Sequence, residues 1–236
     1  MGDSDLETTN AAKAPPATQT TRIKLMTAAE RLFALQGIDG ITNRHILVEA
    51  GQRNESALQY HFGTRDGLIE SILEWRMSPI NEFRNMLIDQ VETEGRTLSM
   101  RDLISAIILP LCEPVRTQEG TNYYNRFLVA IEQSPERTID GFTRGKYDSG
   151  IQRVTALMDA QLSHMSPSVR RQRFGMLAAM ITFGVANIET VMSRRTKDGG
   201  TFNLDRAIEN LIDMCTGAIE APVSDSVTQL TAEPDP

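Results

Sequence analysis

Residues 42–68 read TNRHILVEAGQRNESALQYHFGTRDGL, and this stretch decides the fold. It predicts two short helices joined by a tight turn at Ala50-Gly51, with a further helix starting at Thr64. The second helix is polar on its outer side and ends at Tyr60-His61-Phe62. Two short helices with a glycine-containing turn are typical of a helix-turn-helix, whose second helix enters the DNA major groove.

Local signals place the ends of these helices. Thr42 suits the N-cap of the first helix, with Ile46 and Leu47 pointing inward. Asn54 suits the N-cap of the second helix, and Thr64 that of the next one. An earlier helix from about Thr21 is predicted by an apolar stripe that Gly37 ends as a left-handed cap. The stripe and its partners form the predicted core of this region: Leu25, Met26, Ala29, Leu32, Phe33, Ile46, Leu58 and Phe62.

The rest of the chain shows helical periodicity and no alternating strand pattern. We expect longer helices over 80–93, 99–117, 121–133, 146–164, 167–195 and 203–219, separated by prolines such as Pro79. The predicted class is therefore all-α. We divide the chain into a disordered arm (1–20), a helix-turn-helix head (21–68), a larger helical body (69–220) and a disordered tail (221–236). The boundary between head and body falls within a helix that runs from Thr64 past Trp75.

Charge is distributed unevenly along the chain. The whole protein carries a formal charge of −7, which by itself argues against a partner rich in phosphate. Residues 21–65 contain six basic and four acidic side chains, a net of +2, so the remainder carries −9. A mildly basic head on an acidic body is consistent with a DNA-binding module attached to a second, different module.

Composition excludes several other classes. The first residues, MGDSD, are acidic where a secretory signal needs basic groups, and the longest nearly apolar run, residues 174–186, is shorter than the roughly 20 residues that cross a bilayer. Cys112 and Cys215 lie far apart, which argues against a disulfide framework or a zinc site. His45 and Glu49 have a metal-like spacing without a third ligand nearby. We therefore expect a cytoplasmic protein with no membrane partner, metal or cofactor.

The head resembles the tetracycline-repressor (TetR) family of bacterial transcription regulators over residues 22–76. The resemblance is carried by Leu25-Met26, Ala28-Ala29, Leu32-Phe33, Gly37, Thr42, Ile46, Ala50-Gly51, Leu58, His61-Phe62, Arg65-Asp66 and Leu68. Two departures concern the turn, which is one residue longer than usual before Asn54, and Gln59, which stands where a tyrosine is common. The resemblance implies a homodimeric repressor that a small-molecule effector releases from a palindromic double-stranded DNA operator.

Side-chain chemistry suggests a role for each polar residue of the head. Asn54, Ser56 and Gln59 are expected on the exposed side of the second helix, where amide and hydroxyl groups hydrogen-bond to base edges. Arg44 is placed to reach a guanine edge or a phosphate, and Arg53 could likewise contact a base edge or the DNA backbone. The remaining candidates are expected to hold the DNA backbone and set the register, although a core position for His61 is also open; they are Thr42, Tyr60, His61 and Arg65.

Two sites are predicted in the body. The segment Asn122–Phe127 combines aromatic, amide and basic side chains, which fits a pocket for an apolar or amphipathic effector as well as a packed helix face. The pocket hypothesis assigns Tyr123, Tyr124, Arg126, Phe127 and Met180 to the ligand, although methionines such as Met180 are more often core.

The helix over 167–195 is apolar on more than one face, so one face fits a partner subunit and the alternative is an unusually buried monomer helix. The predicted dimer contacts are Val185, Ile188, Met192, Ile208 and Leu211. A different function class, an all-helical enzyme or ligand carrier, remains as an alternative, although no catalytic cluster or phosphate-binding loop is recognisable.

Overall fold

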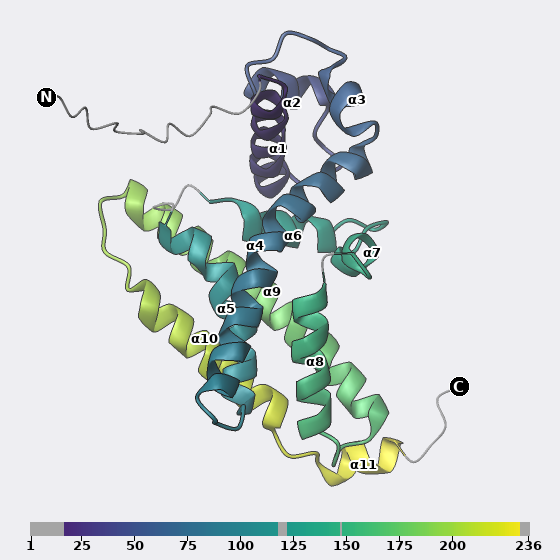
Figure 1. Cartoon of the computed structure of the whole chain (residues 1–236), viewed down its shortest axis with the longest axis vertical. Helices are drawn as coiled ribbons and strands as arrows, with labels where there is room; N and C mark the ends of the chain where they lie inside the picture. The colour runs from purple at the N-terminus through teal and green to yellow at the C-terminus, as the bar shows by residue number, and fades with distance from the viewer. Residues whose placement is uncertain (1–16, 118–121, 147, 232–236) are drawn as a thin grey trace, which may run out of the picture.

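The computed structural model describes residues 17–117, 122–146 and 148–231, and every regular element in these ranges is an α-helix (Figure 1). The all-α prediction is confirmed. In chain order the helices are α1 Ala17–Gln36, α2 Asn43–Glu49, α3 Ala57–Phe62, α4 Arg65–Thr93, α5 Met100–Thr117, α6 Tyr124–Glu132, α7 Ile139–Thr143, α8 Ser149–Gln161, α9 Pro167–Lys197, α10 Leu204–Glu220 and α11 Asp225–Thr231. Helices α1–α3 form the head, and α4 leads from it into the body.

The start of α1 corrects the predicted boundary of the arm. Residues 17–20, expected to be disordered, form the first turn of the helix because the chain from Ala17 onward contains no residue that interrupts it before Gly37. Residues 1–16, the rest of the predicted arm, lie outside the described residues. At the other end the backbone N–H of Gly37 donates to the Phe33 carbonyl at 2.9 Å, and its φ of +79° confirms the left-handed cap.

Helix α2 begins as the sequence predicts, whereas α3 begins later. The Thr42 hydroxyl accepts a hydrogen bond from the backbone N–H of His45, and Nδ1 of His45 accepts one from the backbone N–H of Thr42. The side chain of Asn54 accepts from the N–H of Ser56 at 3.0 Å, which makes a local turn in place of the predicted helix cap. Helix α3 consequently starts at Ala57, and the extra residue of the longer turn lies in the connection before this helix.

Helix α4 is a single element of 29 residues that the head and the body share. Thr64 caps it by accepting from the Gly67 N–H at 2.9 Å. The predicted interruption at Pro79 is wrong. Pro79 lies on the exposed side, and buried positions before and after it, among them Ile72, Leu73 and Ile80, hold both halves against the core. Tertiary packing thus overrides the local preference of proline.

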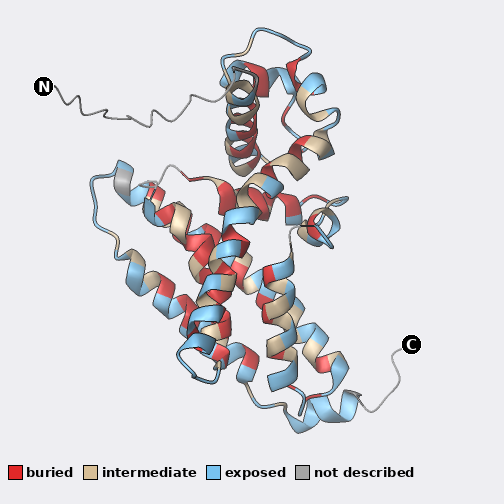
Figure 2. Ribbon diagram, viewed as in Figure 1, coloured by how far each residue is buried: buried red, intermediate tan, exposed pale blue. Residues whose placement is uncertain are grey.

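The body packs around α5, which contacts α4, α8, α9 and α10. Helix α6 lies between α1 and α9, so the head rests on the body through α1 as well as through α4. The rings of Phe33 in α1 and Phe127 in α6 stack with centroids 6.1 Å apart. Buried residues line the facing sides of these helices (Figure 2), and they form one continuous apolar cluster through head and body.

Two short helices differ from the sequence prediction. Helix α7 follows Thr138, whose hydroxyl accepts from the Gly141 N–H at 3.1 Å. Helix α11 lies in the segment predicted as a disordered tail. Ser224 accepts from the Val227 N–H there and Asp225 occupies the first turn, so capping residues start a helix that has little apolar surface to bury. Both helices depend on polar caps, which the apolar periodicity does not report.

Helix α9 is, within the described part of the chain, the one helix whose length and apolar composition would suffice to cross a membrane. Only 33% of its most apolar window is buried. It nevertheless packs against α5, α6 and α10 and carries the buried Glu189, as the core helix of a folded body does. Two large apolar side chains of α9, Met176 and Phe183, remain exposed.

Candidate nucleic-acid interface and ligand cavity

The polar residues predicted for DNA are mostly exposed on one side of the head. Thr42 and Arg44 lie at the start of α2, and the residues of the turn and of α3 follow them. Asn43, Gln59 and Thr64 line the same hollow of about 180 Å³, so the start of α2 lies beside the polar side of α3. The exposed members of this recognition surface are Thr42, Arg44, Arg53, Asn54, Ser56, Gln59 and Tyr60.

The recognition surface carries free positive charge. No carboxylate of the described residues pairs with Arg44 or Arg53. Most acidic groups of the head are engaged elsewhere, since Glu30 bonds to Arg76, Asp39 to Arg137 and Glu49 to Arg31. Glu55 is exposed between Arg53 and Ser56, so Arg44 and Arg53 (+2) and Glu55 (−1) leave the recognition surface with a net formal charge of +1. This local charge favours an anion, although the whole chain is acidic.

Two candidates occupy more interior positions than the sequence suggested. The guanidinium of Arg65 donates to the backbone carbonyls of Ile38 (3.1 Å) and Ile41 and lies over the Phe33 ring. Burial lowers the pKa of Arg65, as expected for a group withdrawn from water. We therefore correct its role from backbone contact to holding the α1–α2 connection. His61 is half-buried, with the Tyr60 ring against it at 5.0 Å.

A cavity of about 890 Å³ lies in the body, within the range typical of small-molecule sites. Helices α4 to α9 all contribute to it. The buried part of the lining is mostly apolar, with Asn81 and Arg84 as its largest polar side chains. The exposed part, at the rim, carries the acidic groups Glu132 and Asp140. Its lining includes Met77, Asn81, Arg84, Ile107, Leu111, Leu128, Glu132, Asp140, Arg144, Asp148, Ile151, Gln152, Met158, Phe174, Leu177, Ile181 and Phe183.

The residues predicted to bind the effector do not line this cavity: Tyr123, Tyr124, Arg126, Phe127 and Met180. Tyr124 and Phe127 are fully buried between α1, α6 and the rest of the core. Arg126 stacks on Tyr123 and binds Glu189 at 2.6 Å. The packed alternative for this segment is therefore the one that the structure supports, because an aromatic helix face fits a core as well as a pocket.

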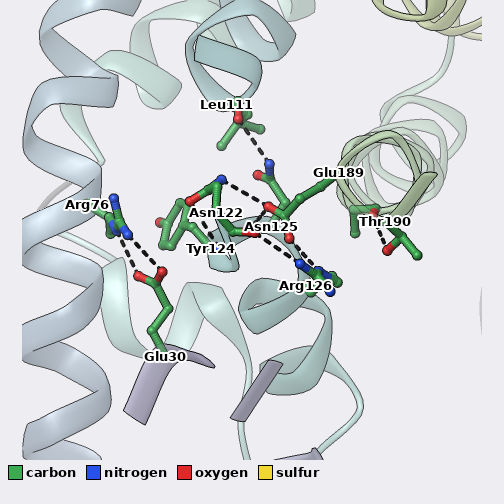
Figure 3. Close-up of polar contacts among 10 residues, drawn as sticks. Glu30, Arg76, Leu111, Asn122, Tyr124, Asn125, Arg126, Glu189 and Thr190 are labelled. Carbon is green, nitrogen blue, oxygen red and sulfur yellow. Dashed lines mark hydrogen bonds and ion pairs between the residues drawn. The ribbon is translucent and has the colours of Figure 1, made fainter. Parts of the chain in front are cut away.

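Figure 3 shows how this segment is held. The carboxylate of Glu189 on α9 accepts from the Arg126 guanidinium, from the Asn122 amide at 3.0 Å and from the Asn125 backbone N–H at 3.1 Å. On the other side of Tyr124, Glu30 of α1 and Arg76 of α4 form a two-bond pair at 2.7 and 2.8 Å. Burial raises the pKa of both carboxyl groups, and the arginines oppose that rise.

Sequence reasoning missed the polar residues that line the cavity from α4. Arg84 lies four residues after Ile80 and four before Ile88, on the buried stripe of the helix. A charged residue on an apolar stripe is unusual, and this signal could have identified it. Asn81, one turn earlier on the same stripe, accepts a hydrogen bond from Arg84 at 2.5 Å.

Comparison with known proteins identifies the body. Residues 105–218 match the family described as tetracyclin repressor-like, C-terminal domain. Residues 105–218 therefore belong to this family of tetracyclin repressor-like C-terminal domains. The head pattern over residues 22–76 and the family match of the body cover separate stretches and agree. Together they support a regulator of transcription.

Solved structures provide a second comparison. Two crystal structures of NalD, the secondary repressor of the MexAB-OprM multidrug efflux pump in Pseudomonas aeruginosa, are similar to this chain. The first has 18% sequence identity over 86% of this chain and 97% of NalD, with a TM-score of 0.48. The second has 16% identity over 85% and 97%, with a TM-score of 0.47. No curated protein sequence matches the chain significantly.

The predicted dimer contacts lie mainly within the core of the protomer. Val185, Ile188, Ile208 and Leu211 are buried within the protomer, and Met192 is half-buried. Leu211 is held close to α9, because a Cβ added at Gly184 would come within 2.7 Å of its side chain. The exposed large apolar side chains of these helices lie elsewhere, at Met176 and Phe183 on α9 and Met214 on α10.

The described residues contain neither a disulfide bond nor a cluster of metal-binding side chains. Cys112 and Cys215 are buried and free, and burial raises their thiol pKa values to about 12 and about 11. Across the described ranges, no group of three or more histidine, cysteine or acidic side chains is arranged to hold a metal ion.

Proposed function

We propose that this TetR-family chain is a cytoplasmic homodimeric repressor that binds a palindromic DNA operator through its heads and leaves it when a small molecule occupies the body cavity. The observation that carries the proposal is the continuity of α4. Its first residues complete the head, and Met77, Asn81 and Arg84 of the same helix line the cavity. A ligand in the cavity therefore contacts the helix that positions the head.

The head has the contacts to move with the upper part of α4. The buried pair of Glu30 and Arg76 ties α1 to α4, and Arg137 binds both Asp39 and Asp66 from the body side. A ligand that binds more tightly to a state with displaced heads lowers the affinity for DNA by the ratio of its two binding constants. Release therefore requires no contact between ligand and DNA.

On DNA, the recognition surface divides into base-reading and positioning groups. Arg44 is placed for a guanine edge or a phosphate, and the amides of Asn54 and Gln59 for adenine. Ser56 and Arg53 serve either kind of contact, and Thr42, Tyr60 and His61 position the backbone. Arg65 is left out of this set, since its donors are used inside the head.

Replacing Arg44 or Gln59 with alanine should weaken binding to the cognate operator by about tenfold or more, because each good contact to a base edge contributes roughly 1–3 kcal/mol. The operator would be recovered by selecting bound fragments from the source genome and measured by fluorescence anisotropy. Arg171→Ala is the matched control, since Arg171 is an exposed arginine near the start of α9, outside the head.

Operator affinity that is unchanged in both head variants would contradict this placing of the recognition surface. The same measurement over a range of salt concentrations tests the phosphate contacts. Affinity should fall linearly on a logarithmic salt scale, with a shallower slope for Arg44→Ala if that arginine contacts a phosphate. A flat salt response of the wild type would contradict DNA binding by this surface.

Replacing Met176 and Met214 with aspartate should convert the dimer to monomers in sedimentation velocity. The side chains of Met176 and Met214 are 73% and 55% exposed on the outward faces of α9 and α10, which pack against each other. An exposed apolar face on two packed helices fits a four-helix interface, and charges buried there would oppose association. Leu230→Asp on α11 is the control, because Leu230 is 71% exposed outside this face. An intact dimer in the double variant would contradict an interface at this face of α9 and α10.

A further inference from the structure

The inner wall of the body cavity contains a buried cation without a counter-ion. Arg84 is 4% exposed. Its Nε donates to the Ala106 carbonyl at 3.2 Å and its Nη1 to Asn81 Oδ1 at 2.5 Å. No carboxylate of the described residues lies within 4 Å of its guanidinium, and its Nη2 makes no hydrogen bond to them. A buried charge that only neutral groups contact is costly in the empty cavity.

The acidic groups of the cavity are separated from Arg84 by their position and by their partners. They lie at the rim, where Glu132 and Asp140 are exposed and Asp148 is half-buried. Each already accepts a hydrogen bond, from the Ile139 N–H, from Arg144 and from the Gly145 N–H respectively. The cavity thus has a cationic group at its buried end, apolar walls and a rim whose acids are engaged.

We propose that the effector is an amphipathic anion, with an acid group that binds the Arg84 guanidinium and an apolar body that fills the cavity. The proposal rests on the proposed function, in which this cavity is the effector site. A carboxylate or sulfonate would accept the free Nη2 hydrogens and neutralise the buried charge. The apolar body would contact Leu111, Leu128, Met158 and Ile181, which are all buried side chains of the lining.

Packing of α8 against α4 fixes the position of the guanidinium. A Cβ at Gly150 would lie 2.9 Å from Asn81 Oδ1 and 3.4 Å from Arg84 Cδ. The absence of a side chain at Gly150 therefore allows the two helices to approach closely over the Asn81–Arg84 pair. Burial lowers the pKa of Arg84 to about 10, so the group still carries its charge at neutral pH. The cation is thus present and positioned before any ligand binds.

The position of Arg84 on α4 also connects ligand charge to the head. The Tyr124 hydroxyl interacts electrostatically with Arg84 and with the Glu30–Arg76 pair that ties α1 to α4. That hydroxyl is buried and has no hydrogen-bond partner among the described groups. An anion at Arg84 would change the field at this junction, and release from DNA requires that the anion favour a state with displaced heads.

The test uses two fluorescent probes that share one ring system. Anilinonaphthalene sulfonate carries a negative charge, and phenylnaphthylamine lacks the sulfonate. The full-length protein should bind the sulfonate more tightly than the neutral probe. Arg84→Met, which keeps the bulk and removes the charge, should weaken sulfonate binding about tenfold or more and leave the neutral probe within about twofold. Arg84→Lys should retain most of the preference for the anion.

Matched variants and a second readout complete the design. Arg144→Met removes an exposed arginine from the rim and should change sulfonate binding little. Thermal unfolding of each variant checks that it folds. A sulfonate that raises the melting temperature of the wild type but not of Arg84→Met supports the site independently of the measured affinities. Equal binding of both probes by the wild type, or an Arg84→Met variant with undiminished sulfonate binding, overturns the proposal.

The same titration with operator DNA present separates this inference from the proposed function. Sulfonate binding that depends on Arg84 supports the anion site whether or not the operator affinity changes. An operator affinity that the bound sulfonate does not change would contradict the proposed release of DNA by a ligand in the cavity. Operator release by the neutral probe, together with no sulfonate preference, would support the proposed function and overturn the anionic effector.

Discussion

Replacing Glu189 with alanine should lower the free energy of unfolding by about 3–5 kcal/mol. Glu189 has no exposed surface and joins α9 to α6 through three partners. The substitution leaves the Arg126 guanidinium, the Asn122 amide and the Asn125 N–H without their acceptor in the interior. Removing one partner from a buried ionic network costs more than the network contributes, because the remaining groups keep their desolvation penalty. Urea unfolding at a fixed protein concentration measures the loss.

Two further variants show whether burial is the cause of that loss. Glu209→Ala removes a carboxylate of the same type from α10, where its pair with Arg101 is largely exposed, and should cost no more than about 1 kcal/mol. Glu189→Gln keeps an acceptor for the two asparagines but leaves the arginine charge unpaired, so its loss should be intermediate. A Glu189→Ala variant as stable as Glu209→Ala would contradict the structural role of this network.

The head could be predicted closely from the sequence because its signals are local. Thr42 and Thr64 cap helices through bonds to residues three positions away, and Gly37 takes the left-handed conformation that only glycine adopts easily. Ile46 and Leu47 follow the apolar period. The late start of α3 was missed because Asn54 caps a turn as readily as it caps a helix.

The sites of the body could not be located in the same way. Amphipathic periodicity says which residues leave water, but it does not distinguish a core from a cavity wall or from a subunit interface. Phe127 faces the core while Phe174 faces the cavity, and both have the pattern of a buried aromatic residue. In α9 the same ambiguity placed Ile188 at the dimer surface, whereas the exposed large apolar side chains of this helix are Met176 and Phe183. These distinctions depend on contacts between distant helices, which one sequence does not reveal.

The division between head and body is also less sharp than the sequence suggests. An independent head would unfold without disturbing the body, and the sequence predicts only one shared helix across the boundary near residue 68. The structure instead has one apolar cluster through both parts, with Phe33 of the head stacked on Phe127 of the body. The Arg137 pairs with Asp39 and Asp66 cross the same junction. We therefore expect head and body to unfold together.

Replacing Phe33 with alanine tests this expectation, with an expected loss of about 3–5 kcal/mol. Phe33 has no exposed surface and supports the Arg65 guanidinium as well as the Phe127 ring, so the variant leaves a cavity at the junction. The matched control is Leu35→Ala on the same helix, where the side chain is 47% exposed and the loss should stay within about 1 kcal/mol.

Two probes report the two parts of the Phe33→Ala protein during urea unfolding. Trp75, the only tryptophan, lies in a groove between α4 and α5 with Pro110 and Pro114, so its fluorescence follows the packing of α4 on α5 in the body. Hydrogen exchange of the α1–α3 amides follows the head. Both should shift by the same free energy, because the cluster that Phe33 completes belongs to both. Loss of protection in the head with an unchanged Trp75 transition would show that the head unfolds alone, and α4 would then be its principal connection to the ligand cavity.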